Sequence, residues 1–154
     1  MTKRLILREF AKTDIPDIKI ILNEAPEAVN FMGVEDACHM PLEDLLMAYI
    51  DNQYRFYGYG MWGIFEKDNQ KLIGMAGLCN TDNGVELGYV IKKSKQRQGF
   101  ATEACRYILN EICEYMGIDS VICTIESGNY ASIKLAEKLQ RQAETTLQTG
   151  FILL

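Results

Sequence analysis

The spacing of the apolar residues changes near Gly99, and this change most constrains the fold of the chain. Before it, the turn signals KDNQ and TDNG predict three strands, over about Gly60–Glu66, Lys71–Leu78 and Val85–Ile91. Two tight turns in succession predict an antiparallel meander. After Gly99, apolar residues recur every three or four positions, which predicts a helix that Gly117 ends.

The rest of the chain predicts further elements on both sides of this unit. A strand is expected in Arg4–Phe10, and helices are expected from about Asp14 to Asn23 and in Met40–Tyr57, with Pro26 ending the first of them. The apolar run in Asp119–Ser127 is typical of a strand buried on both faces. A helix from Asn129, which can cap it, and a terminal hairpin complete the list.

This order predicts a mixed α/β sheet, mostly antiparallel, with helices on both faces. The strand–helix–strand unit from Val85 to Glu126 should form a parallel crossover. The 154 residues fit one domain, 1–154. The first ten residues do not resemble a signal peptide, because Arg8 and Glu9 interrupt the apolar stretch, so we expect a cytoplasmic protein.

Cysteine and histidine usage argues against metal and thiol chemistry. The cysteines are odd in number and lack metal-ligand spacing, which is typical of buried thiols in a reducing compartment: Cys38, Cys79, Cys105, Cys113 and Cys123. The single histidine, His39, falls in an expected loop, so neither a cysteine–histidine pair nor a metal site is predicted.

The net charge of −5 argues against binding driven by nucleic-acid phosphates. It is compatible with a cationic substrate such as an amine, and equally with charge that only aids solubility. The acidic Glu24, Glu27, Glu35 and Asp36 have the same two interpretations.

The segment KSKQRQGFATEAC predicts an anion site at the start of the helix after Gly99. Backbone N–H groups in a first helical turn lack internal partners and carry partial positive charge. Gly99 lets an anion approach closely, Gln96 and Gln98 offer amide donors, and Lys95 and Arg97 add charge. The alternative is a polar surface loop that only begins a helix. Neither a Walker A nor a dinucleotide-binding motif occurs.

Five segments resemble the GNAT superfamily of acyl-CoA-dependent N-acetyltransferases. QRQGFA (Gln96–Ala101) is similar to the Q/R-x-x-G-x-G/A segment that binds the pyrophosphate of coenzyme A. The other four resemble the family's strands and its N-x-x-S helix, in the family's order: KRLILREF, GMWGIFEKDNQKLIGMAGL, VELGYVI and NYASIKLAEKL. The residues of these segments are most similar to the branch of ribosomal-protein N-terminal acetyltransferases.

The resemblance implies acetyl-CoA as cosubstrate and no metal. It implies a cosubstrate site made of the fourth strand, the pyrophosphate segment and the start of the last helix: Tyr89, Val90, Ile91, Gln96, Arg97, Gln98, Gly99, Phe100, Ala101, Thr102 and Asn129. A backbone N–H near Val90 would stabilise the developing oxyanion, which requires the fourth and fifth strands to splay. A homodimer is a further implication.

The resemblance also suggests catalytic groups. Glu86 is the first candidate for general base, and Glu126 or an ordered water are the alternatives. Glu86 could also be a solvent-facing carboxylate without a catalytic role. The tyrosine that many relatives use to protonate the leaving thiolate is replaced by Ala136. Ser132 is then the candidate proton donor, although it could equally help Asn129 to cap the helix.

The acceptor is less defined than the chemistry. Trp62 and Tyr49, with Tyr89, are the aromatic residues expected in the acceptor pocket, and core packing is the alternative for the aromatic segment Tyr54–Trp62. Gln140 and Arg141 replace a Gly-Phe pair common in relatives, so the tail departs from the family pattern. We expect an N-acetyltransferase acting on a protein N-terminus or a small amine. The alternatives are a polyamine, antibiotic or amino-acid acetyltransferase, a non-catalytic acyl-CoA-binding module, or a structural domain without a ligand.

Overall fold

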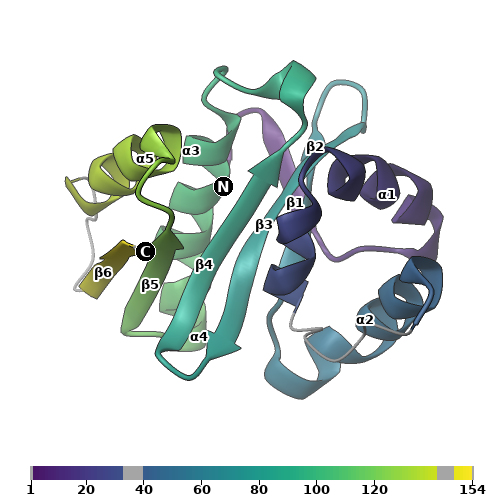
Figure 1. The fold of residues 1–154 in the computed structure, drawn as a ribbon, viewed down its shortest axis with the longest axis horizontal. Helices are drawn as coiled ribbons and strands as arrows, with labels where there is room; N and C mark the ends of the chain where they lie inside the picture. The colour runs from purple at the N-terminus through teal and green to yellow at the C-terminus, as the bar shows by residue number, and fades with distance from the viewer. Residues whose placement is uncertain (1, 33–39, 142–147, 154) are drawn as a thin grey trace.

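The fold is built on one six-stranded sheet in a computed structural model that describes residues 2–32, 40–141 and 148–153. The predictions made for Cys38, His39, Glu35 and Asp36 lie outside these residues. In sheet order the strands are β1 Leu5–Arg8, β2 Met61–Glu66, β3 Leu72–Thr81, β4 Gly84–Ile91, β5 Ser120–Ile125 and β6 Gln148–Leu153. Neighbours from β1 to β4 pair antiparallel, and β4–β5 and β5–β6 pair parallel (Figure 1).

The helices follow the predicted pattern closely. They are α1 Ile15–Glu24, α2 Leu42–Tyr57, α3 Phe100–Tyr107, α4 Cys113–Met116 and α5 Tyr130–Arg141, with short 3-10 turns at Lys12–Asp14, Pro26–Met32 and Lys93–Lys95. A π-helical segment, Ile108–Ile112, joins α3 to α4, so the helix predicted after Gly99 is continuous. Gly117 ends it with the left-handed backbone that glycine favours, at a φ of 65°.

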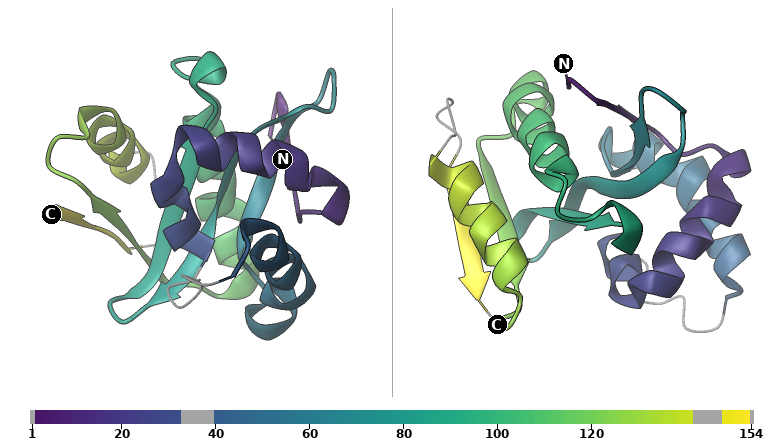
Figure 2. Two further views of the ribbon diagram at one scale, coloured as in Figure 1. Left: turned by 45° about the vertical axis from the view of Figure 1, so that its right-hand side comes forward. Right: turned by 90° about the horizontal axis from the view of Figure 1, so that it is seen from above.

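Two apolar clusters on opposite faces of the sheet confirm the predicted fold class. Phe100 and Ala104 of α3 and Ile108 of the π-helical segment pack with Ala136 and Leu139 of α5 in one cluster. The other cluster contains buried side chains of α1 and α2. Figure 2, in the view from above, shows α1 and α2 on one side of the strands and α3 with α5 on the other. None of the described helices is long and apolar enough to cross a membrane.

Strands β4 and β5 separate soon after they meet. Within the described residues their ladder has a single pair, Glu86 with Ile122. The β3–β4 ladder, in contrast, continues through eight pairs as far as Gly74 and Ile91. The second half of β4 therefore has a backbone edge without a strand partner. This is the splay that the resemblance requires.

The end of the chain differs from the predicted hairpin. The described part of the tail forms one strand, β6, which runs parallel to β5 over six residue pairs. The reason is the position of α5, which lies between the two strands in sequence. A helix of twelve residues can carry the chain back to the end of the sheet where β5 begins, so the next strand is parallel to it.

Candidate active site

A pocket of about 620 Å³ lies beside the free edge of β4. Its walls come from the second half of β4, the loop at residues 92–99, the start of α3 and the inner side of α5. Ten of the eleven predicted cosubstrate residues line it: Tyr89, Val90, Ile91, Gln96, Arg97, Gly99, Phe100, Ala101, Thr102 and Asn129. The eleventh, Gln98, lies in the same loop, and the candidate proton donor Ser132 also lines the pocket. The fold thus brings together segments from three parts of the sequence.

The loop before α3 has the backbone of an anion site. Arg97 and Gly99 both have left-handed backbone, with φ values of 60° and 82°. Alternation of backbone handedness directs successive N–H groups toward one concave side. Among the described residues no side chain caps α3, so the N–H groups of its first turn are available to a ligand. The position of Gly99 agrees with the prediction, and the left-handed Arg97 is an addition to it.

The two glutamines of the loop brace it from within. Gln96 Nε2 donates to the carbonyl of Ile91 at 2.9 Å, and Gln98 Nε2 donates to the carbonyl of Ser94 at 3.4 Å. The carbonyl of Gln98 in turn accepts from Arg4. These amides were predicted as ligand donors, and the structure shows one donor of each amide engaged within the protein.

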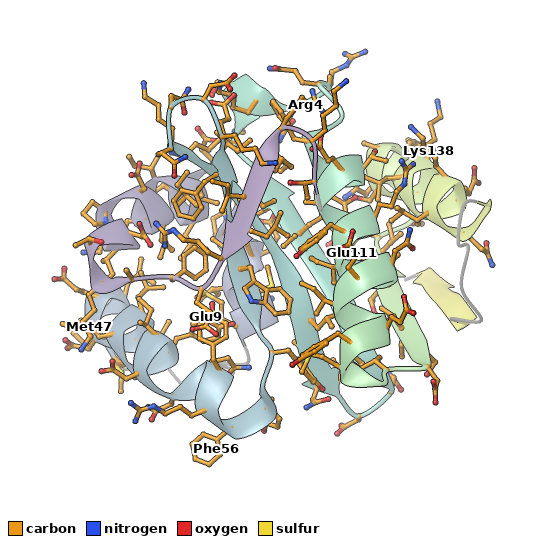
Figure 3. All side chains as sticks on the ribbon, turned by 180° about the vertical axis from the view of Figure 1, so that it is seen from behind. Arg4, Glu9, Met47, Phe56, Glu111 and Lys138 are labelled. Carbon is orange, nitrogen blue, oxygen red and sulfur yellow. The ribbon has the colours of Figure 1, made fainter. Side chains whose placement is uncertain are left out.

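Arg4 and Glu103 clamp the loop to the first strand. The backbone N–H of Arg4 donates to Glu103 Oε1 at 2.7 Å and its Nε donates to Oε2 at 2.8 Å, while Nη1 donates to the carbonyl of Gln98 at 3.0 Å. The guanidinium also stacks on Phe100, 4.4 Å from the ring centroid. Burial tends to raise the pKa of Glu103, but the bonds from Arg4 outweigh it and hold that pKa below its usual value. Figure 3 shows Arg4 at the start of β1, above α3.

A second ion pair supports the other side of the loop. Lys95 Nζ donates to both carboxylate oxygens of Glu66, at 2.8 and 2.9 Å. The backbone N–H of Lys93 donates to Glu24 at 2.7 Å, which ties the loop to the end of α1. The charge of Lys95 is therefore shared with a carboxylate, whereas Arg97 is exposed at the pocket.

Tyr89 and Ser132 meet across the pocket. The hydroxyl of Tyr89, on β4, donates to Ser132 Oγ at 2.8 Å. Burial raises the pKa of Tyr89 to about 12, so the hydroxyl remains a donor near neutral pH. The backbone N–H of Ser132 donates to Asn129 Oδ1 at 3.1 Å, so Asn129 caps α5 as predicted. Ala136, at the position of the tyrosine in many relatives, is buried in the core.

Glu86 lies on a different part of β4. Alternation along the strand places it on the face of Val90, which packs with α1 and α2, whereas Tyr89 faces α3 and α5. Its carboxylate accepts from the backbone N–H of Thr124 at 3.3 Å, where β4 and β5 begin to separate. Glu126 is exposed just after β5.

The two aromatic candidates for the acceptor site are not brought together. Tyr49 is buried among α1 and α2, where its hydroxyl accepts from the backbone N–H of Met61 at 2.7 Å. Trp62 packs against the opposite cluster. Neither belongs to the lining of the 620 Å³ pocket, which contains Tyr89 as its tyrosine.

Several lining residues were not singled out in the sequence as cosubstrate residues. The end of α1 and the turn after it contribute Glu24, Ala25 and Glu27, and α5 contributes Ala131, Lys134, Leu135 and Lys138. The spacing of Lys134 and Lys138, one helical turn apart, could have indicated a basic stripe. Arg4 carried no such signal, because its partners lie 94 and 99 residues away.

These residues fit acetyl-CoA. Unpaired N–H groups at a helix start suit a pyrophosphate, and basic side chains at the rim suit its charge. The free edge of β4 can pair with the amides of an extended arm. The arm would end near Tyr89 and Ser132, beside the point where the two strands separate.

Comparison with known proteins identifies the family of the chain. The model of the acetyltransferase (GNAT) domain family matches residues 4–141. The uncharacterized N-acetyltransferase YjdG of Bacillus subtilis is 26% identical over 147 residues, which are 90% of this chain and 86% of that protein.

Two solved structures show the same fold at low identity. A dodecameric spermidine N-acetyltransferase from Vibrio cholerae has a TM-score of 0.67 and 16% identity, over 88% of this chain and 78% of that one. A ribosomal L7/L12 alpha-N-protein acetyltransferase in complex with coenzyme A has a TM-score of 0.67 and 15% identity, over 90% and 80%. Because the family model covers nearly the whole chain, the protein belongs to the GNAT acetyltransferases, which act with acetyl-CoA.

Proposed function

We propose that this protein is an N-acetyltransferase that moves the acetyl group of acetyl-CoA directly to a primary amine within a ternary complex. The acceptor is a protein N-terminus or a small amine. The observation that carries the proposal is the pocket that joins the anion loop at Gly99 to the free edge of β4 and the Tyr89–Ser132 pair.

Binding is assigned to three groups in this pocket. The first-turn N–H groups of α3 and the side chain of Arg97 would hold the pyrophosphate. Backbone groups of Tyr89, Val90 and Ile91 would pair with the amides of the pantetheine arm. We assign the thioester to the part of the pocket beside the contact between Tyr89 and Ser132.

The transfer itself needs no covalent enzyme intermediate. The new bond forms between the amine nitrogen and the acetyl carbon, the carbon–sulfur bond breaks, and the amine loses one proton as coenzyme A leaves as a thiolate. A backbone N–H near Val90 would stabilise charge on the carbonyl oxygen, and Ser132 would donate a hydrogen bond to the thiolate. Glu86 would accept the amine proton, directly or through water.

The two faces of β4 suggest how the substrates approach. Tyr89 and Ser132 lie on the α3 and α5 side, and Glu86 lies on the α1 and α2 side, with the separation of the strands between them. We assign the acetyl donor to the first side and the amine to the second. Direct transfer then occurs through the gap, which places the amine against the thioester by proximity.

The class of acceptor is tested by a panel. A basic peptide array and a set of polyamines, aminoglycosides and amino acids would be compared by kcat/KM, since relatives of this fold include both a spermidine and a ribosomal-protein acetyltransferase. The net charge of −5 favours cationic acceptors. Tight acetyl-CoA binding without turnover of any amine would support the non-catalytic alternative. Cytoplasmic location and a homodimer remain predictions.

The binding part of the proposal is tested by thermal unfolding. Acetyl-CoA at about a hundred times its dissociation constant should add about 2.7 kcal/mol to stability and raise the melting temperature by several degrees. Gly99→Asp should abolish the shift, because it puts a carboxylate at the pyrophosphate position and strains a left-handed backbone.

Gly117→Asp is the matched control for this experiment. It makes the same change at another left-handed glycine, with a φ of 65° and no heavy atom within 4 Å of the added Cβ. It should lower stability by about 1 kcal/mol and keep the ligand shift. If wild-type protein shows no shift with millimolar acetyl-CoA, the enzyme proposal fails.

A further inference from the structure

The hydrogen bond between Tyr89 and Ser132 determines where the proton of Ser132 can point. A serine hydroxyl has one proton and two acceptor lone pairs. Because the Tyr89 hydroxyl donates to Ser132 Oγ, one lone pair of that oxygen is occupied and its own proton is left for another acceptor. Both hydroxyl groups belong to residues that line the pocket, so this acceptor can be a ligand atom.

Tyr89 is the stronger donor of the pair, because a phenol is more acidic than a serine hydroxyl. Its ring packs in the apolar cluster between β4 and α3, and burial raises the pKa of the phenol to about 12. The nearby thiols of Cys105 and Cys123 are also buried, and burial raises their pKa, so they stay neutral near pH 7. Tyr89 therefore remains protonated, and its hydroxyl has Ser132 as its hydrogen-bond acceptor.

Ser132 is held from the other side by the helix cap. Its backbone N–H donates to Asn129 Oδ1, and it lies in the first turn of α5. The serine is therefore fixed at its backbone by the cap and at its hydroxyl by the tyrosine. Hydrogen bonds in a chain strengthen one another, because each donor polarises the next group.

We propose that Tyr89 is a positioning residue that orients and polarises the Ser132 hydroxyl so that it donates to the sulfur of the leaving thiolate. This rests on the proposed function, because it assumes that acetyl-CoA occupies the pocket. The pair joins β4 to the first turn of α5, whereas position 136, one turn further along the same helix, is an alanine and supplies no hydroxyl. No proton needs to leave either hydroxyl, since the serine stabilises the thiolate as a hydrogen-bond donor.

The thiol of bound coenzyme A reports this contact without any acceptor amine. The thiol of coenzyme A is a simple alkyl thiol and titrates above the pKa of about 8.5 of a peptide cysteine, and a donor aimed at the sulfur favours the thiolate and lowers the pKa of the bound thiol. We would measure the dissociation constants of coenzyme A and desulfo-coenzyme A from about pH 6 to about pH 10.5, so that the free thiol also titrates within the range. The thiolate absorbance of bound coenzyme A gives the same pKa directly.

The ratio of the two affinities removes the effect of other charges near the pocket. Titration of the protein and of the phosphates affects both ligands, whereas only coenzyme A has the thiol. The charged groups that face Tyr89 and Ser132 around the pocket come from α1 and the turn after it, the loop and α5: Glu24, Glu27, Lys93, Lys95, Arg97, Lys134 and Lys138.

In wild-type protein we expect the pKa of the bound thiol to fall by about one unit. The affinity for coenzyme A should then rise about tenfold relative to the affinity for desulfo-coenzyme A as the pH passes from below the bound pKa to above the free pKa. Ser132→Ala should abolish the gain, and Ser132→Thr, which keeps a hydroxyl, should retain part of it. Tyr89→Phe should remove at least about half of the gain. It should have no effect in the Ser132→Ala background.

Tyr130→Phe is the matched control. It removes the same hydroxyl from an exposed tyrosine two residues before Ser132 and should leave the thiol pKa unchanged. A wild-type thiol pKa in Tyr89→Phe would overturn the inference, as would an equal effect of Tyr89→Phe with and without Ser132. If neither coenzyme A nor desulfo-coenzyme A binds, the proposed function is overturned instead. Failure of the inference and failure of the proposed function therefore give different results.

Discussion

At the scale of single residues, Glu86 has two separable roles. It is the proposed base, and its carboxylate also accepts from the Thr124 N–H where β4 and β5 part. Glu86→Gln keeps a carbonyl acceptor for that N–H but cannot take a proton. We predict a loss in kcat/KM of about 10²-fold, with a change in unfolding free energy below about 0.5 kcal/mol.

Glu86→Ala separates the structural role from the chemical one. It also leaves the Thr124 N–H without its partner, so it should cost about 1 kcal/mol in urea unfolding in addition to the loss of activity. Asp82→Asn, in the exposed turn between β3 and β4, is the control and should be silent. Full activity in Glu86→Gln would remove Glu86 as base.

The sequence could predict some of these residues and not others, for physical reasons. The place of Gly99 at the start of the helix was predictable, because the helical spacing of apolar residues begins directly after it, whereas its left-handed backbone, with a φ of 82°, was not part of the prediction. The left-handed backbone of Arg97 was not predictable, because nothing in an arginine side chain favours it. Tyr89 could be placed on a strand, but its bond to Ser132 joins residues 43 positions apart and depends on how α5 packs.

At the scale of elements, the clamp from β1 to α3 should control cosubstrate binding. Arg4→Ala removes the side-chain bonds to Glu103 and Gln98 and the stacking on Phe100. We predict that the dissociation constant of acetyl-CoA rises roughly fivefold to tenfold, which is about 1 kcal/mol. The loss of stability should stay below about 1 kcal/mol, because the Arg4 side chain is 45% exposed.

Two variants test whether geometry or charge carries this effect. Arg4→Lys keeps the charge but loses the planar fork, so it should resemble Arg4→Ala. Lys12→Ala removes one positive charge from an exposed ion pair with Asp51 and should leave acetyl-CoA binding unchanged in calorimetry. Wild-type affinity in Arg4→Ala would show that the loop keeps its shape without β1.

The elements themselves were largely predictable, because their apolar spacing and turn residues are strong local signals. The meander, the long helix after Gly99 and its end at Gly117 all appear as expected. The π-helical segment Ile108–Ile112 and the parallel β6 do not follow from local signals. The direction of β6 depends on where α5 delivers the chain, which is a tertiary property.

At the scale of the whole molecule, three ion pairs join separate segments and make stability depend on pH. They are Arg8 with Asp14, Lys95 with Glu66 and Arg4 with Glu103. Burial tends to raise the pKa of Asp14 and of Glu103, but hydrogen bonds from Arg8 and Arg4 outweigh it. The bond from Lys95 lowers the pKa of Glu66. All three carboxyl groups therefore titrate below their unfolded values in the native state.

The sign of the effect follows from proton binding. Between the lowered native pKa and the unfolded values of about 3.9 for Asp and 4.3 for Glu, the unfolded chain binds more protons. The stability from these groups is therefore fully present above about pH 5 and is lost as the pH falls through the native values. Urea unfolding from pH 7 to pH 2.5 should show a steep decline below pH 5.

A matched pair of triple variants attributes this decline to the ion pairs and not to general charge. Asp14→Asn, Glu66→Gln and Glu103→Gln together should be less stable than wild type at pH 7 and approach it at low pH, which gives a flatter profile. Asp68→Asn, Glu126→Gln and Asp82→Asn remove the same charge from exposed positions and should keep the wild-type slope. Because Glu66 and Glu103 also hold the two sides of the anion loop, acetyl-CoA binding should weaken in the first triple variant and not in the second. Equal slopes in both variants would mean that the decline comes from overall charge, with no special contribution from the contacts that support the site.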